Sequence, residues 1–323
     1  MPNDSERRQS AGNALLGCAI GDCLGVPFEN RAPPPSSWTA GDFAYESTRW
    51  TDDTQQSLVL LDDVLRHGRL DPVRVMDRFV EMRDVDSDGR FGLHRGTGRG
   101  FRHAVDAYAR HGQFSPMAGR CGNGAAMRVV AAAVALGDGD ASRAQLRAVA
   151  SATHADDISL DAAGAVAEAT WALARGRRGD EVIDDVVERL DAGAVKATLR
   201  DALRSSDPFA VIAEAGSQAA GVTLQGGAGD GYALCSPLSA VFVAVRSPSL
   251  HQVLREAVLL GGDTDSTAAM AGALRASVDG VESLPAALLA FPGSATLRRW
   301  GGAALPTHAE WLELETSLMR HRR

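Results

Sequence analysis

The chain has 323 residues, of which 45% are hydrophobic and 23% charged, so it is long enough to form a large globular core. Its formal net charge is −8, which argues against general binding of nucleic acid, because contacts to phosphates need a basic surface. We expect a cytoplasmic protein with no membrane partner, since neither an N-terminal leader nor an uninterrupted apolar segment of membrane length is apparent.

The first predicted helix covers about residues 10–26 and has a glycine at every fourth position: Gly17, Gly21 and Gly25. This spacing lets another backbone approach closely along one face, so we expect a central helix. Glu29 follows, before a proline-rich loop that extends to about Trp50 and could move over a site. The Glu29 carboxylate could be a metal ligand, a general acid or base, or a gate. A surface carboxylate in a loop is the simpler interpretation of the residue alone.

Two acidic residues open the second predicted helix. Asp52 and Asp53 follow Thr51 and precede the apolar segment QQSLVLLDDVL. Adjacent carboxylates at a helix start project about 100° apart, so they can serve two neighbouring cations or bridge them. Asp71-Pro72 then provides an N-cap and a first-turn proline for a third helix.

The middle of the chain contains two glycine-rich segments. In residues 89–100, Arg95 and Arg99 could contact phosphates, but exposed arginines in a loop are more simply interpreted as solvated. The second segment leads directly into a predicted helix, AAMRVVAAAVALG, and consists of Gly122, Asn123 and Gly124. Glycines at a helix N-terminus can cradle a phosphate. A tight turn between helices explains the same residues.

Other polar positions lie where helices end and begin. His154 ends a helix that starts near Ser142, where it either complements the helix dipole or contacts a ligand. Asp156 and Asp157 open the next helix and are interpreted as a cap. We expect reduced, partly buried thiols, because no CxxC pair is present, at Cys18, Cys23, Cys121 and Cys235.

Helical periodicity continues through the rest of the chain. Apolar residues recur at helical spacing in 157–175, 180–191, 193–204, 207–220, 233–246 and 249–260, and shorter helices are expected near 284–291 and 309–320. Alternation of apolar and polar residues is almost absent. Because no linker or composition shift divides the sequence, we predict one compact all-α domain of orthogonally packed helices over 1–323, with its core at about 10–292.

The last acidic cluster lies in residues 259–274, LLGGDTDSTAAMAGAL, where Asp263, Asp265 and Ser266 open an apolar, small-residue helix. Either acidic cluster could be a helix cap. Two clusters with only oxygen ligands also fit a shared site for two Mg²⁺ or Mn²⁺ ions, roughly 3.5–4 Å apart. The residues alone leave both interpretations open.

Taken in order, five segments resemble motifs of the ADP-ribosylglycohydrolase family: GCAIGDCLGVPFE, RWTDDTQ, CGNGAAMR, THADD and GGDTDSTAAMAGAL. The resemblance covers about residues 10–292 and implies an all-α fold with a dinuclear metal cleft. It implies metal binding by Thr51, Asp52, Asp53, Asp263, Asp265 and Ser266. It further implies a catalytic or gating role for Glu29, a share of the acid–base chemistry for Asp263, and ligand binding by Gly122, Asn123, Gly124 and His154.

The sequence also departs from the family pattern. Arg120-Cys121 stand before Gly-Asn-Gly, where some members have Ser-Tyr, so the nucleotide side of the site could be read differently. The metal-binding motifs contain no such departure apart from serine at Ser266, where threonine is more common.

The activity that the resemblance implies is hydrolysis of the glycosidic bond between ADP-ribose and a protein side chain, with arginine the first choice of linkage and serine the second. Hydrolysis of free conjugates such as O-acetyl-ADP-ribose is the alternative activity. A non-catalytic ADP-ribose-binding protein is the alternative of another class, because a fold does not by itself imply function. The complete set of implied metal ligands favours an enzyme. We expect a monomer.

Overall fold

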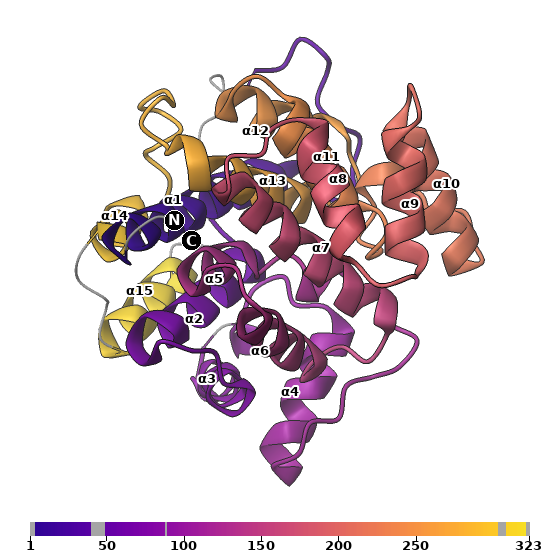
Figure 1. The fold of residues 1–323 in the computed structure, drawn as a ribbon. Coiled ribbons are helices and arrows are strands. Elements are labelled where there is room, and N and C mark those ends of the chain that lie inside the picture. Colours follow the sequence, from indigo (N-terminus) through magenta and orange to yellow (C-terminus); the bar gives the residue numbers. More distant parts are fainter. Residues whose placement is uncertain (1–3, 40–48, 88, 303–307, 321–323) are drawn as a thin grey trace.

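Two helices from opposite ends of the sequence, α1 (Asp4–Gly25) and α13 (Thr264–Asp279), pack against each other in the middle of the molecule (Figure 1). The computed structural model describes residues 4–39, 49–87, 89–302 and 308–320. A Cβ atom added at Gly21 would lie 2.0 Å from the backbone oxygen of Ala268 on α13, so only glycine permits this approach. The prediction of a central, closely packed first helix is confirmed.

Helix α1 begins at Asp4, earlier than predicted, and continues into the 3-10 turn η1 (Val26–Phe28). Together they are long and apolar enough to cross a membrane, as judged by length and composition only. The sequence prediction that no segment reaches this length is therefore wrong. Within the fold, 78% of the most apolar window of this segment is buried, so α1 has the environment of a core helix.

The remaining described helices surround this central pair (Figure 1). They are α2 (Asp52–His67), α3 (Pro72–Asp84), α4 (Arg99–His111), α5 (Val130–Leu136), α6 (Asp140–Ser151), α7 (Asp157–Ala174), α8 (Asp180–Arg189), α9 (Ala194–Leu203), α10 (Pro208–Ala220), α11 (Ser236–Arg246), α12 (Leu250–Leu259), α14 (Ser294–Gly302) and α15 (His308–Arg320). The elements are joined by 3-10 turns η3 (Asn123–Ala125) and η4 (Gly227–Gly229) and by one short extended segment, β1 (Arg90–Leu93). The all-α prediction is confirmed.

Two predicted elements differ from the structure. Residues 284–291 form consecutive tight turns instead of a helix, with the Leu288 amide donating to the Pro285 oxygen at 3.0 Å. Proline stands at both ends of this segment, at 285 and 292, which leaves too few residues for a stable α-helix. The proline-rich loop expected up to Trp50 is described through Thr39, and its residues 40–48 lie outside the described residues.

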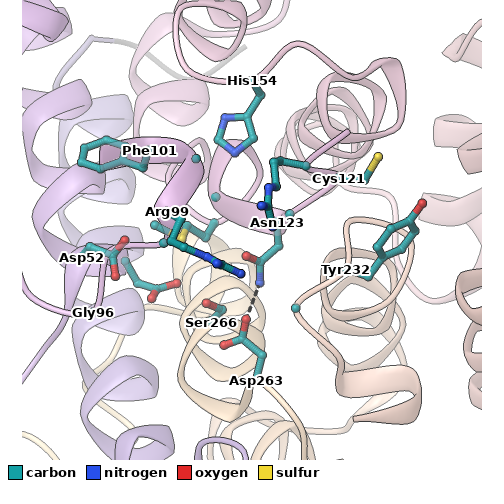
Figure 2. Close-up of a pocket in the computed structure, with 18 of the residues that line it drawn as sticks. Asp52, Gly96, Arg99, Phe101, Cys121, Asn123, His154, Tyr232, Asp263 and Ser266 are labelled. Carbon is teal, nitrogen blue, oxygen red and sulfur yellow. Dashed lines mark hydrogen bonds between the residues drawn. The ribbon is translucent and has the colours of Figure 1, made fainter. Parts of the chain in front are cut away.

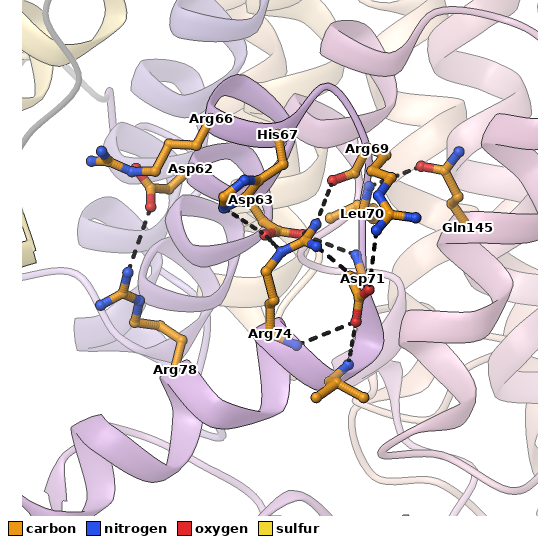
Figure 3. Close-up of polar contacts among 11 residues, drawn as sticks. Asp62, Asp63, Arg66, His67, Arg69, Leu70, Asp71, Arg74, Arg78 and Gln145 are labelled. Carbon is orange, nitrogen blue, oxygen red and sulfur yellow. Dashed lines mark hydrogen bonds and ion pairs between the residues drawn. The ribbon is translucent and has the colours of Figure 1, made fainter.

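A network of charged side chains fixes the corner between α2 and α3 (Figure 3). The buried Asp63 carboxylate accepts hydrogen bonds from Arg74 Nε at 2.6 Å and from the Asp71 amide at 2.9 Å. Asp71 in turn caps α3 through the Val73 amide, as predicted. This corner fixes the C-terminal end of α2, so the acidic N-terminal end of the same helix is held in place.

The C-terminal helix α15 is attached to the core through Glu315, whose side chain is fully buried. Glu315 accepts hydrogen bonds from Trp50 Nε1 at 3.0 Å and from Gln55 Nε2 at 2.6 Å, and it forms an ion pair with Arg95 at 2.5 Å. Arg95 is therefore buried and paired, and the expectation that it is solvated is wrong. The sequence did not reveal this pair because Glu315 lies on a helix far along the chain.

Candidate active site

Carboxylates from the two predicted acidic clusters meet in one cleft with a volume of about 500 Å³. The cleft opens between the N-terminal ends of α2 and α13 and the turn that follows α1. Six acidic residues line it: Glu29, Asp52, Asp53, Asp230, Asp263 and Asp265. The structure thus brings together residues that are separated by more than half the chain.

The ligand oxygens of these residues fall into two groups. Those of Asp22, Asp53 and Asp265 lie within 4.8 Å of one another. The ligand oxygens of Glu29, Asp263 and Asp265 also lie within 4.8 Å of one another. Among the described residues Asp265 belongs to both groups, so its carboxylate could bridge two neighbouring cations.

Asp22 was missed by the sequence analysis. Its fully buried carboxylate accepts hydrogen bonds from the Thr51 amide at 2.9 Å and from the Thr54 hydroxyl at 2.7 Å. It reaches α13 because the glycine face of α1 packs there, with Gly25 directly against the backbone of Asp265. A signal was present in the sequence: a charged residue inside an apolar helix is rarely buried without a partner.

The helix-cap interpretation of the acidic clusters does not account for the structure. Thr51 and Asp263 occupy the N-cap positions of α2 and α13, and neither side chain makes a capping hydrogen bond. The hydroxyl of Thr51 lies 3.1 Å from Asp53 Oδ2. Asp263 accepts a hydrogen bond from Asn123 Nδ2 at 2.8 Å. Both side chains are therefore directed toward the acidic cluster and its neighbours, away from the orphan amides of their own helices.

Burial and mutual repulsion raise the pKa values of this cluster. The pKa values of Asp52, Asp53 and Asp265 are raised well above the usual range, first by burial and then by neighbouring carboxylates. Burial raises the pKa of Asp22 to about 6. Burial also raises the pKa of Glu29, and the charges of Asp263 and Asp22 add to this effect.

Such a cluster has the properties of a cation site. Asp53 Oδ1 is buried without a hydrogen-bond partner in the described part of the chain, and a buried acceptor of this kind calls for a ligand. Only oxygen ligands are offered, which fits Mg²⁺ or Mn²⁺. A divalent cation would also offset the repulsion that raises the pKa values.

The other predicted metal ligands lie at the edge of the two groups. Asp52 lines the cleft, but its Oδ2 accepts a hydrogen bond from Gln56 at 2.9 Å and it belongs to neither group. Ser266 also lines the cleft and hydrogen-bonds the Asp53 side chain. Thr51 bridges Asp22 and Asp53. Asp52, Ser266 and Thr51 therefore lie next to the two groups of ligand oxygens and belong to neither of them.

The Gly122–Gly124 segment lies opposite the carboxylates but has a different local structure from the one predicted. It forms the 3-10 turn η3, and α5 begins only at Val130. The amides of Gly122 and Asn123 donate to Arg120 and Gly231 oxygens at 2.8 and 3.0 Å, so fewer amides are available to an anion than a helix N-terminus would offer. The Asn123 side chain joins Asp263 to Ser236.

His154 lines the same side of the cleft and is almost completely buried. A Cβ atom at Gly124 would lie 3.2 Å from His154 Nε2, so glycine at this position leaves room for the imidazole. Burial and the charge of Arg128 lower the pKa of His154 to about 3. The imidazole is therefore neutral in the physiological pH range.

Arg99, Phe101, Cys121 and Tyr232 also line the cleft, and in Figure 2 the Arg99 side chain reaches toward Asn123 and Ser266. Arg99 begins α4, and Arg120 lies beside Gly100 on a neighbouring loop. Neither guanidinium has a hydrogen-bond or ion-pair partner among the residues that the structure describes. Asp156 holds the Arg120 loop through the amides of residues 119 and 120 and makes no capping bond to α7, so its interpretation as a cap is wrong.

The cleft therefore has two chemically different sides. One side is acidic and suited to cations and to the hydroxyl groups that cations bind. The other side combines glycine backbone, a neutral imidazole and the guanidinium groups of Arg99 and Arg120, and it is suited to an anion.

Comparison with known proteins agrees with this geometry. The chain is similar to the ADP-ribosylarginine hydrolase Tri1 of Pseudomonas putida (strain GB-1), with 26% identity over 85% of this chain and 72% of that protein. It is similar to the ADP-ribosylhydrolase ARH3 of Homo sapiens, with 25% identity over 84% of this chain and 85% of that protein. A solved structure described as an ADP-ribosylglycohydrolase-related protein complex shares the fold, with a TM-score of 0.70 and 23% identity over 97% of this chain and 99% of that chain.

A family model described as ADP-ribosylglycohydrolase matches residues 3–312, which is nearly the whole chain. The matched range includes both acidic clusters, the Gly122–Gly124 turn and His154. The chain is an enzyme that hydrolyses glycosidic bonds, and it belongs to the ADP-ribosylglycohydrolase family.

Proposed function

We propose that this enzyme removes ADP-ribose from modified protein side chains, with arginine as the first choice of linkage and serine as the second, in a reaction that depends on two divalent cations. The observation that carries the proposal is the meeting of two acidic groups that share Asp265, opposite a side of the cleft suited to an anion. ADP-ribose has a matching polarity, with ribose hydroxyls at one end and a pyrophosphate in the middle.

In this proposal, Asp22, Asp53 and Asp265 hold one cation, and Glu29, Asp263 and Asp265 hold the other. When bound, Mg²⁺ or Mn²⁺ would supply Lewis acidity and fixed positive charge to the ribose oxygens. The anionic pyrophosphate would lie toward Gly124, His154 and the two arginines at the opening.

Cleavage of a glycosidic bond passes through an oxocarbenium-like state, which nearby carboxylates stabilise. Glu29 and Asp263 lie on the open side of the acidic cluster, where they can contact both water and the leaving side chain. We assign the proton transfers to this pair: one carboxyl accepts a proton from the attacking water, and a carboxyl of the same pair assists the departing group.

The preference for arginine rests on charge and on similarity. Glu29 is the most exposed member of the acidic cluster, so it presents negative charge where the modified side chain must enter. A guanidinium is attracted to such a position, whereas a serine hydroxyl is not. The similarity to a protein named ADP-ribosylarginine hydrolase points to the same linkage.

The test is release of free ADP-ribose from two defined peptides, one ADP-ribosylated on arginine and one on serine, with Mg²⁺, with Mn²⁺ and with EDTA. We expect cleavage of the arginine-linked peptide that EDTA abolishes. Cleavage of the serine-linked peptide alone would reverse the assigned linkage, and cleavage in EDTA would overturn the metal dependence.

A third substrate, O-acetyl-ADP-ribose, separates the alternative activity. If it is the only compound cleaved, the enzyme acts on free conjugates. If no compound is cleaved and ADP-ribose still raises the melting temperature, the chain binds ADP-ribose without hydrolysing these bonds.

A further inference from the structure

A chain of buried hydrogen bonds runs behind the cleft from the acidic side to His154. Gln56 Nε2 donates to Asp52 Oδ2 at 2.9 Å, and Arg128 Nη1 donates to Gln56 Oε1 at 2.6 Å. Arg128 Nη2 donates to Thr153 Oγ1 at 2.6 Å. The Thr153 hydroxyl lies 2.9 Å from His154 Nδ1. The two sides of the cleft are thus joined through one guanidinium.

The chemistry of arginine fixes the direction of this chain. A guanidinium can only donate, so Gln56 must present its oxygen to Arg128 and its amino group to Asp52. Thr153 must likewise accept from Arg128. Its own proton then has two candidate acceptors, the Ala150 oxygen at 3.3 Å and His154 Nδ1 at 2.9 Å. The shorter contact favours donation to Nδ1, which leaves the imidazole proton on Nε2.

Arg128 holds an unusual position for a charged side chain. It is fully buried beside Phe79, its Nε has no partner among the described residues, and its two bonded acceptors are neutral. A buried guanidinium without an adjacent carboxylate is costly. A purely structural role would be filled more cheaply by an apolar side chain of similar size, so the position calls for a functional explanation.

We propose that Arg128 and Thr153 are positioning residues that hold His154 as its Nε2–H tautomer, so that this nitrogen donates a hydrogen bond to an anionic ligand group in the cleft. His154 Nε2 has no hydrogen-bond partner in the described structure and lies beside Gly124 at the cleft wall. A nitrogen that carries a proton attracts a phosphate oxygen, whereas a bare nitrogen repels it.

The same guanidinium holds Asp52 through Gln56, so one side chain orients groups on both sides of the cleft. Thr153 serves only the His154 side. Loss of Thr153 should therefore weaken binding of the anion, and loss of Arg128 should in addition disturb the acidic side where the bond is cleaved. This part of the inference rests on the proposed function.

The tautomer itself can be measured without any substrate. Two-bond proton–nitrogen correlation spectra of ¹⁵N-labelled protein distinguish the Nε2–H from the Nδ1–H imidazole. The chain has eight histidines, so His154 is assigned by its absence in the His154→Gln variant. We expect the Nε2–H pattern, and the Nδ1–H pattern would overturn the proposal even if the enzyme cleaves no ADP-ribosylated peptide.

Variants test this chain of hydrogen bonds. In Thr153→Val we expect the single Nε2–H pattern to be lost. The Kd for ADP-ribose should rise roughly tenfold or more, which is the effect of losing one hydrogen bond to a charged group, and kcat should change less than threefold. Thr153→Ser keeps the hydroxyl and should restore both. The matched control is Thr170→Val, which removes another buried hydroxyl, one that donates to the Val166 oxygen of its own helix, and it should leave both readouts unchanged.

Arg128→Lys keeps the charge but cannot bridge both acceptors in the same geometry. We expect the same rise in Kd for ADP-ribose together with a fall of at least tenfold in kcat. An ADP-ribose Kd within twofold of wild type in Thr153→Val would overturn the assigned role of Thr153, and an unchanged kcat in Arg128→Lys would overturn the link to Asp52. If no peptide is cleaved by wild type, the proposed function fails while the tautomer and Kd measurements still decide this inference.

Discussion

The carboxylate of Asp22 accepts hydrogen bonds from both the backbone amide and the hydroxyl of Thr54, at 3.1 and 2.7 Å. A residue of α1 therefore satisfies the first turn of α2, where an N-cap side chain usually would. The same carboxylate faces Asp53 and Asp265. One buried side chain thus couples the packing of three helices to the geometry of the acidic site.

Replacement of Asp22 by asparagine should remove a cation ligand and keep the size of the side chain. We expect a loss of roughly 100-fold or more in ADP-ribose release, together with loss of the Mg²⁺-dependent rise in melting temperature. Asp62→Asn, on the outer part of α2, is the matched control because its ion-pair partners in the described part of the chain are Arg66 and Arg78, away from the cleft. An Mg²⁺ response equal to wild type in Asp22→Asn would exclude Asp22 as a ligand.

The pKa of Asp22 predicts how the stability of the metal-free protein depends on pH. Burial raises this pKa to about 6, above the value of about 3.9 in an unfolded chain. Between these values the folded state binds more protons, so the free energy of unfolding falls as the pH rises from about 4 to 6.

The measurement is urea unfolding in EDTA across this pH range, with Asp22→Asn for comparison. Wild type should lose on the order of 3 kcal/mol relative to the variant, and saturating Mg²⁺ should remove most of that loss. A difference between wild type and variant that stays constant with pH would contradict the assigned pKa.

Gly21→Ala should strongly destabilise the fold, because the added Cβ would lie 2.0 Å from the Ala268 oxygen and would push α1 away from α13. We expect a loss of about 3 kcal/mol in the free energy of unfolding, or more. Gly164→Ala in α7 is the control, since its Cβ would meet only Leu190 at 3.8 Å. That variant should gain about 0.5–1 kcal/mol from helix propensity. Equal effects of the two substitutions would refute the close packing of α1 and α13.

Glu315→Ala should leave the Arg95 guanidinium buried without its carboxylate. The expected cost is about 3–5 kcal/mol in the free energy of unfolding. Trp50 would lose its hydrogen bond as well. Because Trp50 directly precedes the Thr51–Asp53 segment, we also expect kcat to fall. Glu313→Ala on the exposed face of α15 is the matched control and should change stability by less than about 0.5 kcal/mol.

Arg120→Ala should weaken the anionic side of the cleft without reaching the acidic side. We expect KM for an ADP-ribosylated peptide to rise about three- to tenfold with kcat nearly unchanged, and the effect should shrink at high salt, because the guanidinium is exposed. Arg110→Ala at the far end of α4 removes an equal charge away from the cleft and serves as the control. A fall in kcat at unchanged KM would show that Arg120 does not act through binding.

Much of the architecture could be predicted from local patterns. Helical spacing identified most helices, and the glycine face of α1 indicated its central place. The prediction failed where proline shortened a segment, at 284–291, and where the interior gave Gly122–Gly124 a 3-10 turn. Both failures reflect boundaries that local spacing does not determine.

The candidate site was predicted in part. Asp53, Asp263 and Asp265 meet as expected, since pairs of acidic residues at helix starts carry a recognisable pattern. Asp22 and Arg128 carry no such pattern, because each is a single charged residue within an apolar stretch. Their roles depend on contacts to residues far away in the sequence, and only the folded chain reveals those contacts.

The packing of α1 against α13 has a consequence for the order of events during protein synthesis. Asp22 is translated some 240 residues before its partner Asp265. Contacts over so long a loop form late, because closing the loop costs entropy before the contacts repay it. The acidic cleft therefore cannot assemble on a nascent chain until α13 has left the ribosome, and the enzyme stays inactive until then.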